Sequence, residues 1–75
     1  MRFYHVEQYG RRCICHNDNA YNTEKGLKEV CTRIVAKAKK AVKQGNMVAG
    51  AFDVIVCDRT GRELDSFHCG TDYTY

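Results

Sequence analysis

The stretch Thr23–Gln44, TEKGLKEVCTRIVAKAKKAVKQ, decides how this chain folds, because its residues alternate as in one long amphipathic helix. At about 100° per residue, the apolar positions fill one side of the helix: Leu27, Val30, Cys31, Ile34, Val35, Ala38, Ala41 and Val42. The other side is basic, with Lys28, Arg33, Lys37, Lys39, Lys40 and Lys43. Asn22 or Thr23 suits the N-cap, and Gly45 suits the left-handed residue that ends a helix.

The segments on either side of this helix have the composition of strands. Arg2–Gln8 alternates apolar and polar residues, and Arg12–His16 follows it after a turn at Gly10. Val48–Asp58 and Glu63–Cys69 form a second pair beyond the helix. The order predicts an α+β fold, β-β-α-β-β, in which about four antiparallel strands carry one long helix on one face.

The length and composition predict one folded domain. The chain has 75 residues, 44% hydrophobic and 28% charged, which is ordinary for a globular domain and unlike a disordered chain. We expect a single domain over residues 1–75, with 70–75 as a short C-terminal tail. The N-terminus has no apolar signal sequence and no stretch is long enough to cross a bilayer, so we expect a cytoplasmic protein without membrane contact.

The last two strands predict which residues enter the core. Asp58–Arg62 is typical of a three-residue hairpin loop with Gly61 in the left-handed conformation. That loop places Val56 opposite Leu64 and Val54 opposite Ser66. The predicted core side of this hairpin is therefore Phe52, Val54, Val56 and Leu64, and the other side is Ile55, Cys57, Phe67 and Cys69.

One helix covers only one face of a sheet, so the second side of the hairpin is a candidate contact surface. We predict partner binding by Ile55 and Phe67, joined by Tyr4 from the first strand. The alternative is that the twist of the sheet and the tyrosine-bearing tail cover these residues. A homodimer through this surface is compatible with the same pattern.

Zinc binding is a second hypothesis, and it has weak support. The candidate ligands are Cys13, Cys15, His16, Cys57, His68 and Cys69, but structural zinc sites usually offer paired C-x₂₋₄-C units, which this chain lacks. The five cysteines are an odd number with no secretion signal, which favours free thiols in a reducing compartment. We expect no metal and no cofactor.

Catalysis is not expected from this sequence. The pairs Cys15–His16 and His68–Cys69 are neighbours in strands, so their side chains diverge, whereas a thiolate nucleophile needs a converging base. A small domain also has little room for a substrate pocket of several hundred Å³. The sequence therefore predicts a non-enzymatic protein.

Nucleic-acid binding is the alternative to protein binding. The basic surface formed by Arg33, Lys37, Lys40 and Lys43 is suited to phosphate contacts, and the net charge is +3. Against this, lysine commonly fills the solvent side of an amphipathic helix, and no signature of a known RNA- or DNA-binding module is present.

The final hairpin, Val56-Cys57-Asp58-Arg59-Thr60-Gly61-Arg62-Glu63-Leu64, has the pattern V-x-D-x-x-G-R-E-L and is similar to that of small bacterial domains of unknown function. The order of elements also resembles small single-domain proteins of phages and mobile elements. The anti-CRISPR and other anti-defence proteins are of this size and build. The resemblance implies a non-enzymatic inhibitor that sterically blocks a host CRISPR or other nucleoprotein complex in the host cytoplasm. It transfers no individual functional residue, because such inhibitors share no motif.

Overall fold

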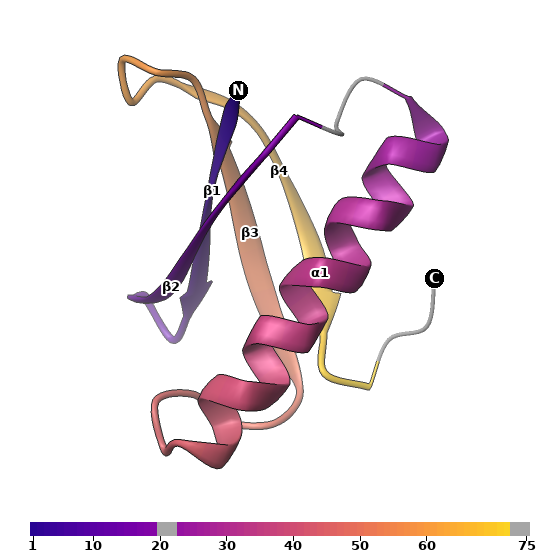
Figure 1. Ribbon diagram of the computed structural model, residues 1–75. Helices are drawn as coiled ribbons and strands as arrows, with labels where there is room; N and C mark the ends of the chain where they lie inside the picture. The colour runs from indigo at the N-terminus through magenta and orange to yellow at the C-terminus, as the bar shows by residue number, and fades with distance from the viewer. Residues whose placement is uncertain (20–22, 73–75) are drawn as a thin grey trace.

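A computed structural model of the chain describes residues 1–19 and 23–72. The elements are β1 (Arg2–Gln8), β2 (Arg11–Asp18), α1 (Glu24–Lys43), β3 (Ala51–Cys57) and β4 (Glu63–Gly70). The fold is α+β with the β-β-α-β-β order that the sequence predicts. Figure 1 shows α1 lying diagonally across one face of the sheet.

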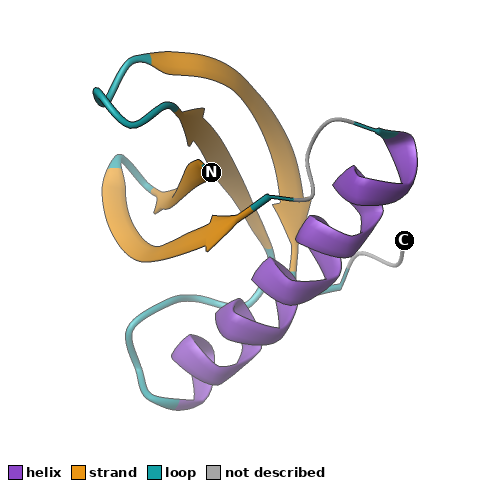
Figure 2. Ribbon diagram, turned by 45° about the horizontal axis from the view of Figure 1, so that its top comes forward, coloured by secondary structure: helices purple, strands orange, loops and turns teal. Residues whose placement is uncertain are grey.

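The four strands form one antiparallel sheet in the order β2-β1-β3-β4. The first strands of both hairpins are therefore central, and β2 and β4 are the edges. The two hairpin turns lie at opposite ends of the sheet, and the loop from α1 to β3 lies at the same end as the β1–β2 turn (Figure 1). Figure 2 shows the strong twist and curvature of the sheet and the helix layer on one side only.

Helix α1 begins and ends where the sequence predicts, for local reasons. The Thr23 hydroxyl accepts a hydrogen bond from the Gly26 N–H at 3.0 Å, which is the expected N-cap geometry. At the other end Gly45 has φ of 80°, and the Asn46 N–H donates to the Ala41 carbonyl, as in a Schellman motif. Asn22, the alternative N-cap, is outside the described residues.

The core lies between α1 and the sheet, and it contains the predicted helix stripe. Val30, Cys31, Ile34, Ala38 and Ala41 are nearly fully buried against side chains of the central strands.

Among the described residues, no helix combines the length and apolarity needed to span a bilayer.

The register predicted for the β3–β4 hairpin is wrong beyond its turn. The loop itself is as expected, with Gly61 at φ of 89° and the Asp58 N–H donating to the Arg62 carbonyl at 3.0 Å. A β-bulge then inserts Leu64 as an extra residue, so that Val56 pairs with Asp65 rather than with Leu64.

A shift of one residue moves a strand's side chains to the opposite face. Phe67 therefore pairs with Val54 and packs against the core, Cys69 is fully buried, and Leu64 is 43% exposed. The bulge favours burial because it places two apolar side chains of β4, instead of one, on the helix side.

Candidate partner-binding surfaces

Tyr4 does not lie on the uncovered face, contrary to the sequence prediction. It is fully buried on the helix side, paired with Val56 of β3 and His16 of β2. Its ring centroid is 5.9 Å from that of His16. Burial, and secondarily the nearby Asp18 carboxylate, raises the pKa of Tyr4 to about 12. Tyr4 is thus a core residue and is not available to a partner.

The sheet face that α1 leaves uncovered, here called the open face, has an apolar centre. Phe3, His5 and Ile55 are half-buried there, and Cys57 is 6% exposed. Cross-strand pairing holds them together, because Phe3 faces Cys57 and His5 faces Ile55 across β1 and β3. Of the three predicted partner contacts, only Ile55 is on this face.

Ionisable side chains surround the apolar centre of the open face. Glu7 and Arg12 approach to 4.0 Å, and the His68 ring contacts the Asp53 carboxylate at 2.5 Å. Glu63, opposite Cys57, adds a third carboxylate against the one guanidinium. The exposed Cys15 thiol lies 3.4 Å from His5 Nδ1. An apolar centre within a polar rim is the usual anatomy of a protein interface.

The net positive charge of helix α1 is larger than that of the whole chain, which is +3. Helix α1 has seven basic and two acidic side chains, a net charge of +5, while the rest of the chain has five basic and seven acidic ones, a net charge of −2. Lys25, Lys37, Lys39, Lys40 and Lys43 form no ion pair with any side chain that the structure describes. The two faces of the molecule therefore differ in the sign of their charge.

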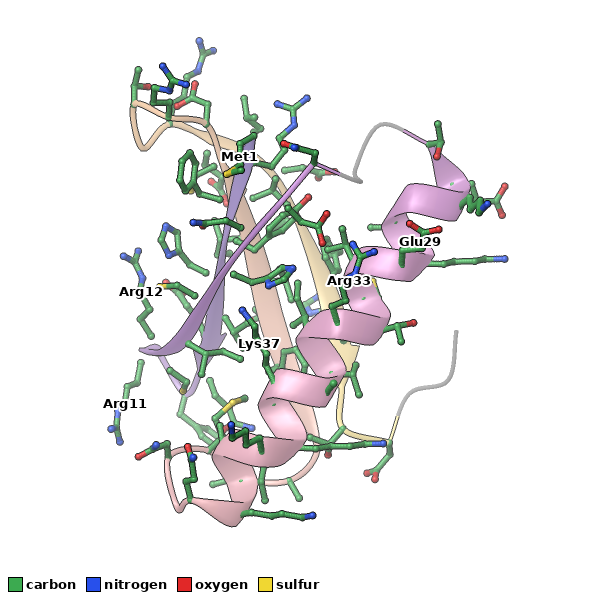
Figure 3. The ribbon with its side chains drawn as sticks, viewed as in Figure 1. Met1, Arg11, Arg12, Glu29, Arg33 and Lys37 are labelled. Atoms are coloured by element: carbon green, nitrogen blue, oxygen red, sulfur yellow. The ribbon has the colours of Figure 1, made fainter. Side chains whose placement is uncertain are left out.

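Arg33, one of the predicted basic contacts, is used within the fold. Its guanidinium binds the Asp18 carboxylate at 2.5 Å. The same carboxylate oxygen lies 3.0 Å from His16 Nε2. The Asp18 hydrogen bond raises the pKa of Arg33. Figure 3 shows Arg33 and Lys37 on the side of α1 toward β2, with Glu29 beside Arg33. This cluster joins the edge strand β2 to the helix.

A third surface, which the sequence reasoning missed, lies at the β1–β2 turn. Tyr9 and Gly10 both have positive φ, 54° and 73°, as a two-residue type I′ hairpin loop requires. Asparagine, aspartate or glycine normally holds the first position, because a left-handed conformation costs other L-residues about 1–2 kcal/mol. Yet Tyr9 is 88% exposed, so its ring gains almost nothing from packing within the fold.

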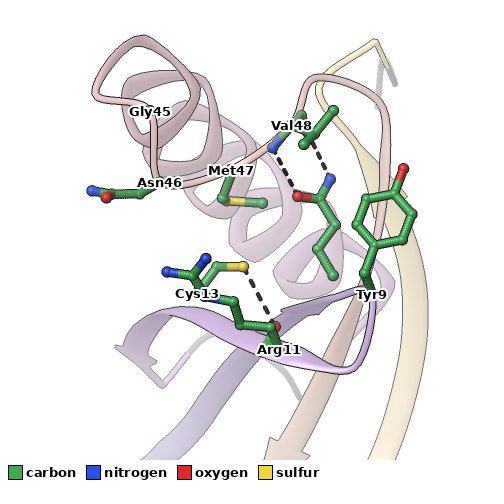
Figure 4. A pocket seen from close by; sticks show the side chains of 8 residues that line it. Tyr9, Arg11, Cys13, Gly45, Asn46, Met47 and Val48 are labelled. Carbon is green, nitrogen blue, oxygen red and sulfur yellow. Dashed lines mark hydrogen bonds between the residues drawn. The ribbon is translucent and has the colours of Figure 1, made fainter.

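A hollow of about 260 Å³ adjoins Tyr9 and is named here the turn-end hollow. It is lined by Gln8, Tyr9, Arg11, Cys13, Gly45, Asn46, Met47 and Val48. Figure 4 shows Met47, Val48 and Tyr9 around it, with Arg11 and Cys13 on the β2 side. The volume is below that of ordinary cofactor or drug pockets and suits one or two side chains of a partner.

Gln8 holds this hollow in shape. Its buried amide accepts a hydrogen bond from the Val48 N–H at 2.9 Å and donates to the Val48 carbonyl at 2.6 Å (Figure 4). These bonds fasten the loop between α1 and β3 to the end of β1. As a result the Val48 side chain, which is 56% exposed, is held outward. It therefore loses little conformational freedom when a partner binds.

The candidate metal ligands are dispersed. Cys31, Cys57 and Cys69 are buried, Cys13 is half-buried, and all five cysteines are free thiols. Within residues 1–19 and 23–72, no group of three or more His, Cys, Asp or Glu side chains converges as a metal site would require.

One signal in the sequence could have identified the turn surface. The dipeptide Tyr9–Gly10 stands where Asn-Gly or Asp-Gly is typical of a tight hairpin, which is a local exception to turn preference.

Comparison with known proteins gives no match, whether with family models, curated proteins or solved structures.

Proposed function

We propose that this protein is a non-enzymatic protein-binding module that docks through its open face. The observation that carries this proposal is the half-buried apolar centre of Phe3 and Ile55 on the face opposite α1. Apolar side chains of this size contribute about 1.5–3 kcal/mol each when they are fully buried. A partner that covers both side chains therefore gains binding free energy comparable to that of an interface hot spot.

The charge distribution indicates the chemistry of that partner. The rim of the open face has three carboxylates and one guanidinium, whereas the helix on the other side has a net charge of +5. A partner surface with an apolar centre and a basic rim would attract the open face and repel the helix. This arrangement favours one docking orientation and fast association.

Protein surfaces that hold nucleic acid are basic, so they fit this description. Together with the resemblance to anti-defence proteins, this supports a phage-type inhibitor that sterically occupies a surface of a host CRISPR or other nucleoprotein complex in the host cytoplasm. Pairing of two open faces in a homodimer is the competing occupant of the same surface.

The test uses a purified CRISPR effector complex loaded with guide RNA and measures its affinity for the immobilised protein by interferometry. The variant Phe3→Thr/Ile55→Thr keeps β-favouring residues in the strands and should bind at least tenfold more weakly. Ala36→Ser, a substitution at an exposed apolar position of α1, is the control and should bind normally.

Unchanged affinity of a folded Phe3→Thr/Ile55→Thr variant would contradict the open-face proposal. Light scattering on the same samples tests the homodimer. If the wild-type chain is dimeric and the double variant monomeric, the open face is a self-association surface instead.

Nucleic-acid binding by the basic helix surface is the second candidate, and the charge segregation favours it. Lys37→Glu/Lys40→Glu should then weaken binding to a labelled duplex, with a loss that shrinks at high salt because phosphate contacts release counterions. The same change should leave open-face binding almost unaffected.

A further inference from the structure

The turn-end hollow is a distinct feature from both surfaces discussed above, and three independent observations meet there. Tyr9 occupies a left-handed turn position without packing, Val48 is held outward by the Gln8 amide, and both residues line a preformed hollow of about 260 Å³. Exposed apolar groups that are fixed in place lose little entropy when a partner covers them. Backbone strain without a folding benefit is commonly associated with a functional position.

The lining of the hollow specifies the chemistry of its occupant. Met47, Val48 and the Tyr9 ring form apolar walls, and Met47 is itself buried beneath the hollow. The lining contains no carboxylate, and the exposed Arg11 guanidinium forms no ion pair with a side chain in the described part of the chain. Arg11 and Arg12 diverge from the start of β2 (Figure 3), so that only Arg11 lines the hollow, while Arg12 pairs with Glu7.

From this geometry we propose that the turn-end hollow is a docking site for an acidic protein segment with one large apolar anchor residue. The anchor side chain enters the hollow against Met47 and Val48, and the Tyr9 ring covers it. A carboxylate of the same segment binds the Arg11 guanidinium, which can form two parallel hydrogen bonds with it. Tyrosine and arginine are also the residue types most enriched at interface hot spots.

A protein segment fits these observations better than a nucleic-acid strand does. Proteins that bind single strands stack successive bases on several aromatic rings. In the described residues Tyr9 is the only aromatic side chain among the large exposed hydrophobic ones, the others being Met1, Val48 and Leu64. The lining of the hollow also includes the aliphatic Val48 and the thioether of Met47, which suit an aliphatic or aromatic amino-acid side chain.

The experiment selects a phage-displayed library of random linear peptides against the immobilised wild-type chain. Enriched peptides are then synthesised with a fluorescent label and titrated by anisotropy. We expect them to place Asp or Glu close to Leu, Met, Phe or Trp. Roughly 30-fold weaker binding is expected for Tyr9→Asn and for Arg11→Glu, the size of a hot-spot loss.

Three controls separate this site from the other surfaces. Tyr9→Asn places the preferred residue at the turn, so a thermal melt should show that the variant remains folded. Arg59→Glu makes the same charge reversal at the opposite turn and should leave peptide affinity unchanged. Phe3→Thr/Ile55→Thr should also bind the peptides normally, which distinguishes failure here from failure of the open-face proposal.

Peptides that bind Tyr9→Asn and Arg11→Glu as well as the wild type would overturn the proposal, as would a selection that enriches no acidic apolar sequence. Titration with a labelled oligothymidine provides the remaining arm. If the oligonucleotide binds and its binding alone depends on Tyr9 and Arg11, the site belongs to nucleic acid instead.

Discussion

The two hairpins of this protein have the same strand arrangement, but their turns differ in how they are stabilised. Each pairs a central strand with an edge strand and contains one β-bulge, at Cys13 in β2 and at Leu64 in β4. At the β3–β4 turn, the Asp58 carboxylate accepts hydrogen bonds from the Thr60 N–H, the Thr60 hydroxyl and the Arg62 N–H. At the β1–β2 turn, Tyr9 is strained and exposed.

The Asp58 turn satisfies its own backbone groups and presents only polar side chains. The Tyr9 turn is strained and exposes an aromatic ring to water, and it is the turn that we propose serves a binding surface. Mutations in each hairpin can test this contrast, beginning with the largest expected effect.

The bulge in β4 gives the sharpest test of the observed register. Phe67→Asp should destabilise the fold by about 3 kcal/mol or more, because it places a charge among core side chains. Leu64→Asp should change the free energy of unfolding by about 0.5 kcal/mol or less, since Leu64 is an exposed bulge residue. Urea unfolding of both variants measures this, and the reverse ranking would restore the bulge-free register.

Removal of the Gln8 clamp should be the next largest effect. Gln8→Ala leaves the Val48 N–H and carbonyl without their partners, so we expect a loss of about 1–3 kcal/mol. Hydrogen exchange should show faster exchange at Val48 and little change at Asp58–Arg62. Equal loosening of both ends would mean that the clamp acts globally.

The Asp58 turn predicts a pH dependence. Hydrogen bonds, chiefly from the Thr60 hydroxyl, lower the pKa of Asp58 below its usual 3.8. Its contribution is therefore present above the unfolded-state pKa and is lost as the pH falls through the lower folded-state pKa. Asp58→Ala should lower Tm at neutral pH, and the difference from the wild type should shrink below about pH 4. A difference that is constant down to pH 2 would contradict the hydrogen-bond explanation.

Tyr9→Asn should give a small effect of the opposite sign. Relief of the left-handed strain should stabilise the protein by about 1 kcal/mol, which is roughly 4–8 °C in Tm for a domain of this size. Calorimetry of the variant beside Tyr9→Phe separates turn strain from the phenol group. A fall in Tm would show that the Tyr9 ring supports the fold after all.

Much of the fold could be predicted because the relevant signals are local. The spacing of Val30, Ile34 and Ala41, the Thr23 cap and the Gly45 stop all depend on neighbours within one or two turns of helix. The loop that contains Gly61 could likewise be predicted from nearby residues. The homodimer, the protein partner and the absence of catalysis stay predictions, since they depend on contacts beyond this chain.

The candidate site was harder to predict because faces depend on pairing between distant strands. The bulge at Leu64 exchanges the faces of Phe67 and Ser66, and no local pattern requires it. The sequence pattern predicts Tyr4 on the open face, although its pairing with Val56 and His16 places it in the core. The pattern also predicts Arg33 on the basic helix surface, but its guanidinium binds Asp18 of β2.

The sequence by itself determined the helix, the strands, their order along the chain and the basic helix surface, because each follows from residue periodicity over short distances. Only the tertiary structure decided the strand order in the sheet, the two bulges, the place of Phe3 and His5 on the open face and the hollow beside Tyr9. The physical reason is that the burial of a side chain depends on the whole layer of side chains that packs around it. The sheet accepts an extra residue in β4 because the layer against α1 then gains more apolar contact, and that gain involves residues far apart in the chain.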